Sequence, residues 1–187
     1  MDCVPGKPYS LRPEGYHENA AEAISILIDV GIPVGVQTVL VKDNISLEII
    51  DELYDWCIKK KVKEWSLLRF FPSGRGVQFA HCEPSRKEYI QAINYIENLK
   101  NLRSGLDIQL QYVLTRENNI NCRAVSSSIG ILPNGMCVSC FWGLVKNTKV
   151  VDESFILGNL VEQSINEILS RPKAIKWENN EKCLIFD

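Results

Sequence analysis

The chain has 187 residues, enough for one domain with a small appendage and for a buried core. Its composition, 45% hydrophobic and 24% charged, excludes a disordered chain, and the net charge of −2 gives no field that would attract nucleic acid or an anionic membrane. No apolar run approaches the ~18 residues of a membrane span and the N-terminus has no signal-peptide pattern, so we expect a cytoplasmic protein with reduced cysteines.

The first two thirds of the chain alternate between predicted helices and strands. Apolar residues at helical spacing predict helices over 16–30, 47–60 and 85–99. The last of these opens with a capping box of Ser85 and Glu88. Apolar, β-rich runs predict strands over 34–41, 65–71 and 108–114, and we expect the first of them to be buried on both faces. This alternation predicts an α/β fold with right-handed crossovers and a parallel sheet.

A β-hairpin is predicted next, with strands over Ser127–Leu132 and Met136–Phe141. Pro133-Asn134-Gly135 joins them, because proline fixes φ and the Asn-Gly pair tolerates the positive φ of a tight reversal. A hairpin brings its ends together, so Cys122 and Cys140 are expected to converge. Converging thiols in a chain without an export signal are more often a metal or cluster site than a disulfide.

The spacing of these cysteines carries a resemblance to a known family. Twelve residues separate Cys122 from Gly135, and four more separate Gly135 from Cys140. This resembles the C-x9–15-G-x4-C signature that opens the SPASM or twitch extension of radical S-adenosylmethionine (SAM) enzymes. Flanking segments are similar to the same family's pattern, namely residues 11–16, 31–44, 68–76, 155–160 and 164–168.

The resemblance implies a fold, a division of the chain and a cofactor. It implies that residues 1–115 form the C-terminal half of a partial (β/α)6 TIM-like barrel, and that residues 116–187 form a β-hairpin-plus-helix SPASM/twitch appendage. In the family, the cysteines matching Cys122 and Cys140 are ligands of an auxiliary iron–sulfur cluster, expected here to be of the 4Fe–4S type. Cys183 resembles the start of the family's later cysteine run. The implied activity is peptide or cofactor modification.

One element of the family pattern is absent from the sequence. Radical SAM enzymes hold the SAM-cleaving cluster with a C-x3-C-x2-C loop, whereas Cys3, Cys57 and Cys82 stand alone. We therefore expect a fragment or one half of a split enzyme, inactive by itself. A missing N-terminal half or a partner chain would complete it, SAM would bind only in the complete enzyme, and the substrate would be a peptide or a small molecule.

Cys137 leaves alternatives open. It forms a C-x-x-C with Cys140, but positions i and i+3 of a strand face opposite sides, so both can be ligands only if the strand bends. Cys137 is either a structural thiol or a substitute ligand. A zinc module using Cys122, Cys137, Cys140 and Cys183 is a second hypothesis. A non-catalytic half-barrel that binds a peptide or partner is a third.

Candidate residues of the SAM cavity lie on the predicted barrel strands, whose carboxyl ends face active sites. Gln37 or Thr38 on the first strand, and Leu68 or Arg69 on the second, are expected to line it; sheet core for Leu68 and a surface salt bridge for Arg69 are the alternatives. Arg75 lies between two glycines and is a candidate for binding a substrate carboxylate or phosphate, or is part of a turn. The isolated His17 and His81 are expected to face solvent, and Cys57 to lie in the core.

Overall fold

The structure is a computed structural model that describes residues 1–72, 74–103, 105–111, 122, 124–144 and 152–179. The chain forms two units, one of residues 1–70 and 81–116 and the other of residues 71–80 and 117–187. No helix within the described ranges is long and apolar enough to cross a membrane.

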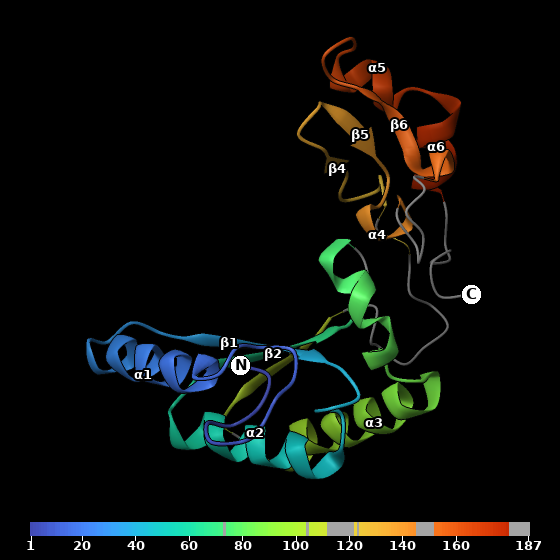
Figure 1. The fold of residues 1–187 in the computed structure, drawn as a ribbon. Helices are drawn as coiled ribbons and strands as arrows, with labels where there is room; N and C mark the ends of the chain where they lie inside the picture. Colours follow the sequence, from blue (N-terminus) through green and yellow to red (C-terminus); the bar gives the residue numbers. More distant parts are fainter. Residues whose placement is uncertain (73, 104, 112–121, 123, 145–151, 180–187) are drawn as a thin grey trace. The chain divides into compact units, whose positions relative to one another are not determined.

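The first unit is built on a parallel sheet (Figure 1). Its strands, in spatial order, are β1 (Gly35–Leu40), β2 (Glu64–Arg69) and β3 (Asp107–Leu110). Gly35 lies opposite Glu64, which in turn lies opposite Asp107. The predicted α/β fold with a parallel sheet is confirmed, and the partial barrel stays a prediction.

Three helices of the first unit follow the predicted ranges closely. They are α1 (Tyr16–Asp29), α2 (Leu47–Lys59) and α3 (Arg86–Leu102). Past the end of α1, Gly31 takes a φ of +81° and its N–H donates to the Ile28 carbonyl at 2.9 Å, a turn that suits glycine. The predicted capping box opens α3: Ser85 Oγ accepts from the Glu88 N–H at 3.3 Å, and Glu88 Oε2 accepts from the Ser85 N–H at 2.7 Å.

Only one face of the sheet carries the core of the first unit. Alternate strand residues pack with side chains of α2 and α3 and are almost completely buried: Val36, Leu40, Trp65, Leu67 and Ile108. The intervening Gly35 and Gln37 are exposed. The expectation that the first strand is buried on both faces is therefore wrong here, because the described residues place helices against one face only (Figure 1).

The second unit contains the predicted hairpin, with shorter strands. β4 (Gly130–Ile131) and β5 (Met136–Val138) are antiparallel, and β6 (Ile156–Asn159) pairs with the other edge of β5. In the turn, Gly135 has a φ of +82° and donates its N–H to the Leu132 carbonyl at 2.9 Å. A Cβ at Gly135 would lie 2.7 Å from atoms of Asn159 and Val161, so glycine is required by space as well as by φ.

Short helices surround the core of the second unit. They are α4 (Phe141–Leu144), η3 (Glu153–Phe155), α5 (Ile165–Leu169) and α6 (Pro172–Glu178). The Phe155 and Trp177 rings lie 4.8 Å apart, and Trp177 Nε1 donates to the Ser154 carbonyl at 3.2 Å. A Cβ at Gly143 would lie 1.9 Å from the Phe155 ring, so the close packing of α4 on this ring depends on glycine.

Candidate functional site

Cys122 and Cys140 are attached to neighbouring segments of the second unit. Both side chains are partly buried and pack against the same core. Cys122 precedes β4 and Cys140 follows β5, the two paired strands of the hairpin. Ser128, which precedes β4, bridges to Ala124, and Ala124 follows Cys122 by two residues. Both thiols therefore flank the hairpin and pack against the same core.

The backbone just after Cys122 is strained. Val125 has a φ of +68°, a conformation that a β-branched residue rarely adopts. Its N–H donates to the Ser128 carbonyl at 2.8 Å, and the Ser126 N–H donates to the Ala124 carbonyl at 2.8 Å. Such outliers cluster at functional sites, where the surrounding structure holds them in place. This tight loop spans Ala124–Ser128 and begins two residues after Cys122.

Cys137 has a different environment. Its side chain is completely buried on β5, and it lies opposite Ile131 on one side and Gly158 on the other. The β5–β6 pairing is irregular at Cys137 and Val138, and β5 ends at Val138, so no regular strand runs through Cys140. Burial raises the pKa of the Cys137 thiol, which disfavours the thiolate that a metal binds. This environment favours a structural role, and a ligand role for Cys137 stays a prediction.

The described thiols fit part of a cluster ligand set. The cysteines within the described ranges are all free, and Cys122 and Cys140 would supply two of the roughly four thiolates that iron–sulfur clusters take. Cys183 lies outside the described residues. Among the residues that the structure does describe, no three His, Cys, Asp or Glu side chains are grouped to hold a metal ion. Cys122 and Cys140 alone are thus an incomplete set that accepts a cluster only with further ligands.

The exposed face of the sheet in the first unit forms the floor of a cleft of ≈ 430 Å³. Its floor is lined mainly by alternate strand residues: Gly35, Gln37, Val39, Glu64, Ser66 and Leu68. Its wall comes from the N-terminal segment and the start of α1: Met1, Asp2, Arg12 and Tyr16. Cationic, anionic and neutral polar groups all line this cleft, so it suits a small polar molecule that carries both charges.

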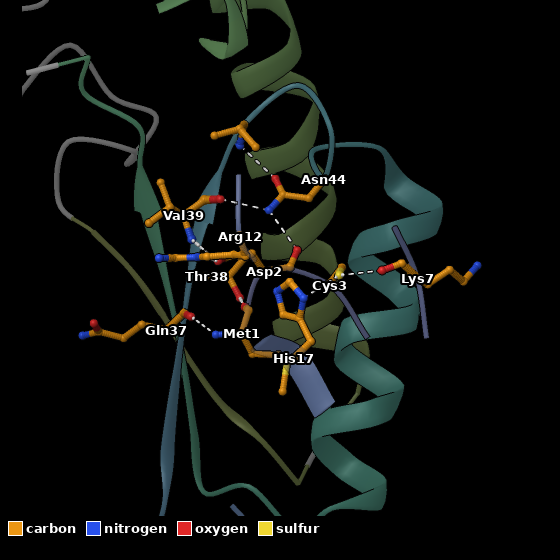
Figure 2. A network of polar contacts seen from close by, with 11 residues as sticks. Met1, Asp2, Cys3, Lys7, Arg12, His17, Gln37, Thr38, Val39 and Asn44 are labelled. Atoms are coloured by element: carbon orange, nitrogen blue, oxygen red, sulfur yellow. Dashed lines mark hydrogen bonds and ion pairs between the residues drawn. The ribbon is translucent and has the colours of Figure 1, made fainter. Parts of the chain in front are cut away.

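The N-terminal segment lies along the free edge of β1. The Met1 ammonium donates to the Gln37 carbonyl at 2.8 Å, and Thr38 Oγ1 donates to the Met1 carbonyl at 2.6 Å (Figure 2). Thr38 Oγ1 also accepts from Trp65 Nε1 at 2.8 Å. The hydroxyl of Thr38 therefore joins the N-terminal segment to the core beneath the sheet.

Asp2 fixes Arg12 at the wall of the cleft. The nearly buried Asp2 carboxylate accepts from Arg12 Nε at 2.8 Å and from the Val39 N–H at 3.2 Å (Figure 2). The Arg12 guanidinium also lies 4.8 Å from the centre of the Tyr16 ring. Because Arg12 is held by a charge on one side and an aromatic face on another, its position in the wall is well defined.

The Asn44 side chain also binds the N-terminal segment, and it joins that segment to the backbone of β1. Its Nδ2 donates to the carbonyls of Asp2 at 3.0 Å and Val39 at 2.9 Å, and its Oδ1 accepts from the Val41 N–H at 2.8 Å. The Asn44 side chain is fully buried. It satisfies peptide groups that the edge of β1 would otherwise leave unpaired.

The four residues predicted for a SAM cavity lie on two different faces. Gln37 and Leu68 line the cleft, and the Gln37 side chain points away from His17 in Figure 2. Thr38 faces the helix-covered core. The Arg69 guanidinium lies 4.9 Å from the centre of the Tyr89 ring on α3 and 3.5 Å from Glu83. The structure places only Gln37 and Leu68 in one cavity, and a SAM role for any of the four stays a prediction.

Arg75 is exposed in the 3-10 segment η1 (Gly74–Cys82). Gly74 precedes it with a φ of +54°, which a residue with a side chain rarely adopts. A role for Arg75 in substrate binding stays a prediction.

His17 is buried, so the expectation that it faces solvent is wrong. Its side chain is 5% exposed, and its Nδ1 lies 3.3 Å from Cys3 Sγ. The rings of Tyr9 and Tyr16 meet it edge to face, at centroid distances of 5.4 and 5.2 Å. Burial is the main cause that lowers the pKa of His17 and raises that of Cys3, so both groups are held neutral.

Sequence reasoning missed most of the cleft wall. Asp2, Arg12 and Asn44 stand in or near segments that resemble the radical SAM pattern, but nothing in their spacing assigns them a partner. Asp2 contacts Asn44, 42 positions away, as well as Arg12, 10 positions away, and neither distance follows a helical or strand period. Arg12 could have been singled out from the sequence only because residues 11–16 resemble the radical SAM pattern.

Comparison with known proteins supports the assignment of the second unit. Residues 122–184 match the model of the SPASM family, described as an iron–sulfur cluster-binding domain. This match includes Cys122, Gly135 and Cys140, and it confirms the resemblance to radical SAM enzymes of the SPASM type. No curated protein matches the chain.

Solved structures similar to the chain extend the likeness to both units. SuiB of Streptococcus suis bound to its precursor peptide SuiA has a TM-score of 0.61 and 16% identity, over 87% of this chain and 39% of SuiB. SuiB bound to S-adenosylmethionine gives a TM-score of 0.60 at 16% identity, over 87% of this chain and 39% of that one. Native anSMEcpe with AdoMet and the Kp18Cys peptide gives 0.56 at 14% identity, over 86% of this chain and 44% of that one. At these identities the likeness concerns the fold, and the chain spans less than half the length of these enzymes.

Proposed function

We propose that the chain is the C-terminal portion of a radical SAM enzyme of the SPASM type. In this proposal residues 1–115 form the second half of a partial (β/α)6 barrel, and residues 116–187 form the domain of an auxiliary iron–sulfur cluster. The observation that carries the proposal is the Cys122–Gly135–Cys140 set, which lies around the β4–β5 hairpin inside the matched SPASM region.

Cys122 and Cys140 are the proposed ligands in the described chain, with Cys183 as a further ligand. Their partial burial against the same core supports this role, because the core would shield a cluster bound to them from water on one side. When bound, an auxiliary cluster supplies electron transfer or a point of attachment for substrate. Cys137 is proposed as a structural thiol, because it is fully buried and the pKa of its thiol is raised.

The cleft of the first unit is the proposed wall of the SAM and substrate cavity. Gln37 offers an amide and Leu68 an apolar surface to a ligand there, while Arg12 and Glu64 offer opposite charges. This lining suits SAM, which carries an amine, a carboxylate and a sulfonium. Thr38 and Arg69 are proposed to position the strands that line the cavity, since both contact the core side of the sheet.

A peptide is the proposed substrate class. SuiB and anSMEcpe, which share this fold, were solved with peptides bound. Arg75 is exposed and cationic, so we assign it to a carboxylate of such a substrate. SAM cleavage requires the C-x3-C-x2-C loop, which the sequence lacks, so the proposal assigns that step to a complementary N-terminal half, and the chain alone should release no 5′-deoxyadenosine.

Cluster reconstitution tests the proposal. Anaerobic incubation of the chain with iron and sulfide should give a brown protein with charge-transfer absorption near the boundary of the visible and ultraviolet. Cys122→Ala or Cys140→Ala should abolish the absorption, because each removes a thiolate that the cluster needs. Cys57→Ala is the matched control, since Cys57 is fully buried in the first unit. Equal loss in all three variants, or bound zinc without iron and sulfide, would reject the cluster in favour of adventitious iron or a zinc module.

A further inference from the structure

Three loops meet at the end of the first unit where the strands begin. The Lys63 N–H donates to the Val34 carbonyl at 2.9 Å, which joins the loop before β2 to the loop before β1. The Asp107 N–H donates to the Lys63 carbonyl at 3.2 Å and adds the loop before β3. A Cβ on Gly105 would lie 3.5 Å from Ile58 Cδ1, so the end of α2 lies against the same loop. We call this the amino-end surface, and its described residues are 30–34, 58–63, 102–103 and 105–107.

Large aliphatic side chains are exposed on the amino-end surface. Leu102 is 84% exposed and Val30 68%, and Ile32 and Ile58 are 48% and 38% exposed. They come from the ends of all three helices and from the loop before β1. Single exposed apolar residues need no explanation, but several at one end of a unit mark a contact surface.

Lysines stand among these aliphatic side chains. Lys59, Lys61 and Lys63 are exposed, and within the described ranges no ion pair joins them to a carboxylate. Lys60 is half-buried, and its Nζ donates to Ser25 Oγ at 2.9 Å. The three exposed ammonium groups are therefore available to an anionic partner.

The carboxylates that begin β2 and β3 are held along the sheet. Glu64 Oε1 accepts from Ser66 Oγ at 2.7 Å, and Asp107 Oδ1 accepts from Gln109 Nε2 at 2.8 Å. Asp29, at the end of α1, is a further exposed acid. The net charge of the chain is −2, but screening limits the reach of each charge to about 8 Å, so the sign of the local charge decides what binds here.

Lys61 occupies a backbone position that suits glycine. It has a φ of +59°, its N–H donates to the Ile58 carbonyl, and the next N–H donates to the Cys57 carbonyl, both at 3.0 Å. Gly31 ends α1 in the same way, with a φ of +81° and the same pair of bonds at 2.9 Å. Lysine at this position costs stability that glycine would not. The strain favours a role for the Lys61 cation beyond ending the helix.

The composition of the amino-end surface distinguishes between classes of partner. Protein interfaces are enriched in arginine and aromatic residues and depleted in lysine. The surface contains no aromatic residue, and its Arg103 is paired with Asp51 and Asp55. Single-stranded nucleic acid likewise stacks on aromatic side chains. Lysines beside exposed aliphatic side chains are instead typical of a surface that lies on an anionic lipid bilayer.

We propose that the amino-end surface docks on an anionic membrane surface. Lys59, Lys61 and Lys63 bind lipid phosphates, while Leu102 and Val30 enter the boundary between headgroups and acyl chains. The contact is peripheral and reversible, because only side chains of loops and helix ends take part. This inference goes beyond the proposed function and does not depend on it.

Sedimentation of the 187-residue protein with vesicles tests the surface. Binding is expected to vesicles of phosphatidylglycerol and phosphatidylcholine in equal amounts, and none to phosphatidylcholine alone. Lys59→Gln combined with Lys63→Gln should weaken binding about fivefold for each lysine removed. Lys87→Gln combined with Lys176→Gln is the matched control, since it changes the net charge equally through exposed lysines outside the surface.

Lys61 variants separate binding from stability. Lys61→Gly relieves the left-handed φ, so the melting temperature should rise, while loss of the cation should weaken vesicle binding about fivefold. Lys61→Arg keeps the cation and should bind vesicles like the unaltered protein. A lysine that serves only to end α2 would leave vesicle binding unchanged in both variants, and this result would contradict the proposal.

Leu102→Ser examines the apolar part of the contact. It should weaken vesicle binding severalfold without changing the melting temperature, because the side chain is exposed. The proposal is overturned if anionic vesicles do not bind, if phosphatidylcholine vesicles bind equally well, or if the two lysine pairs give equal losses. Binding of a DNA oligonucleotide that needs Lys59 and Lys63 but not Leu102, without vesicle binding, would assign the surface to nucleic acid instead. Each of these outcomes leaves cluster reconstitution, which decides the proposed function, unaffected.

Discussion

Asn44 bonds to three backbone groups through one fully buried side chain. Asn44→Ala would leave the Val41 N–H and the carbonyls of Asp2 and Val39 without these bonds. We expect the free energy of unfolding of the first unit to fall by about 3 kcal/mol, since each buried polar group left unpaired costs about 1–3 kcal/mol. Denaturant titration measures it. The neighbouring exposed Asp43→Ala should cost less than about 0.5 kcal/mol, and an equal loss in both variants would contradict the role of Asn44.

His17 should make stability depend on pH. Burial lowers its pKa from the ordinary value of 6.5, so the folded state takes up a proton less readily than the unfolded chain. The stability from neutral His17 is complete above pH 6.5 and is lost as the pH falls through the lower folded pKa. His17→Gln should therefore lose less stability than the unaltered chain between about pH 7.5 and pH 5 in urea titrations. Parallel pH profiles of the two proteins would reject this.

The N-terminal amine changes the pH dependence of stability in the same direction as His17. Burial is the largest cause that lowers the pKa of the Met1 ammonium, so its contribution is also lost as the pH falls. The difference between the two proteins, rather than either profile alone, isolates His17.

The stability of helix α3 depends on the capping box in its first turn. Ser85 and Glu88 exchange hydrogen bonds there, and those from Ser85 lower the pKa of Glu88 below its ordinary value of 4.5. Ser85→Ala should cost about 1 kcal/mol at neutral pH. The cost should shrink as the pH falls through the lowered pKa of Glu88, because the protonated carboxyl is a weaker acceptor. Lys87→Ala in the same turn is the control, and circular dichroism melting curves at two pH values provide the measurement.

Elements set by local signals were predictable from the sequence. The helical spacing of apolar residues gave α1 and α2 to within one residue at either end, and the capping box gave the start of α3. The hairpin turn followed from Pro133-Asn134-Gly135, but its strands are shorter than predicted. The strained loop at Val125 uses residues expected in β4, and the irregularity at Cys137 ends β5 early.

Contacts between distant residues were not predictable in the same way. The Cys122 and Cys140 pair was recognisable because a family spacing marks it, whereas the cleft wall depends on Asp2 meeting Arg12 and Asn44. Burial of His17 likewise depends on Cys3 and Tyr9, which reach it from another segment. A single sequence carries the pattern of each element and contains no direct record of which loops meet.

At the scale of the molecule, the two units have separate cores. One surrounds Leu53 and Trp65, and the other surrounds Ile168 and Trp177. We expect two unfolding transitions, because each core can be lost without the other. Leu53→Ala should lower one transition and Ile168→Ala the other, each by about 2–5 kcal/mol. Calorimetry combined with hydrogen exchange distinguishes them, and a single transition shifted by both substitutions would show that the units unfold together.

The contact between Gly143 and Phe155 restricts which substitutions the two positions can tolerate during evolution. A methyl group on Gly143 would occupy the space of the Phe155 ring, which also packs on Trp177. A smaller side chain at 155 would make room at 143, but alone it would leave a cavity beside Trp177. Substitutions at the two positions should therefore be correlated among related sequences. A residue larger than glycine at 143 should occur together with a residue smaller than phenylalanine at 155.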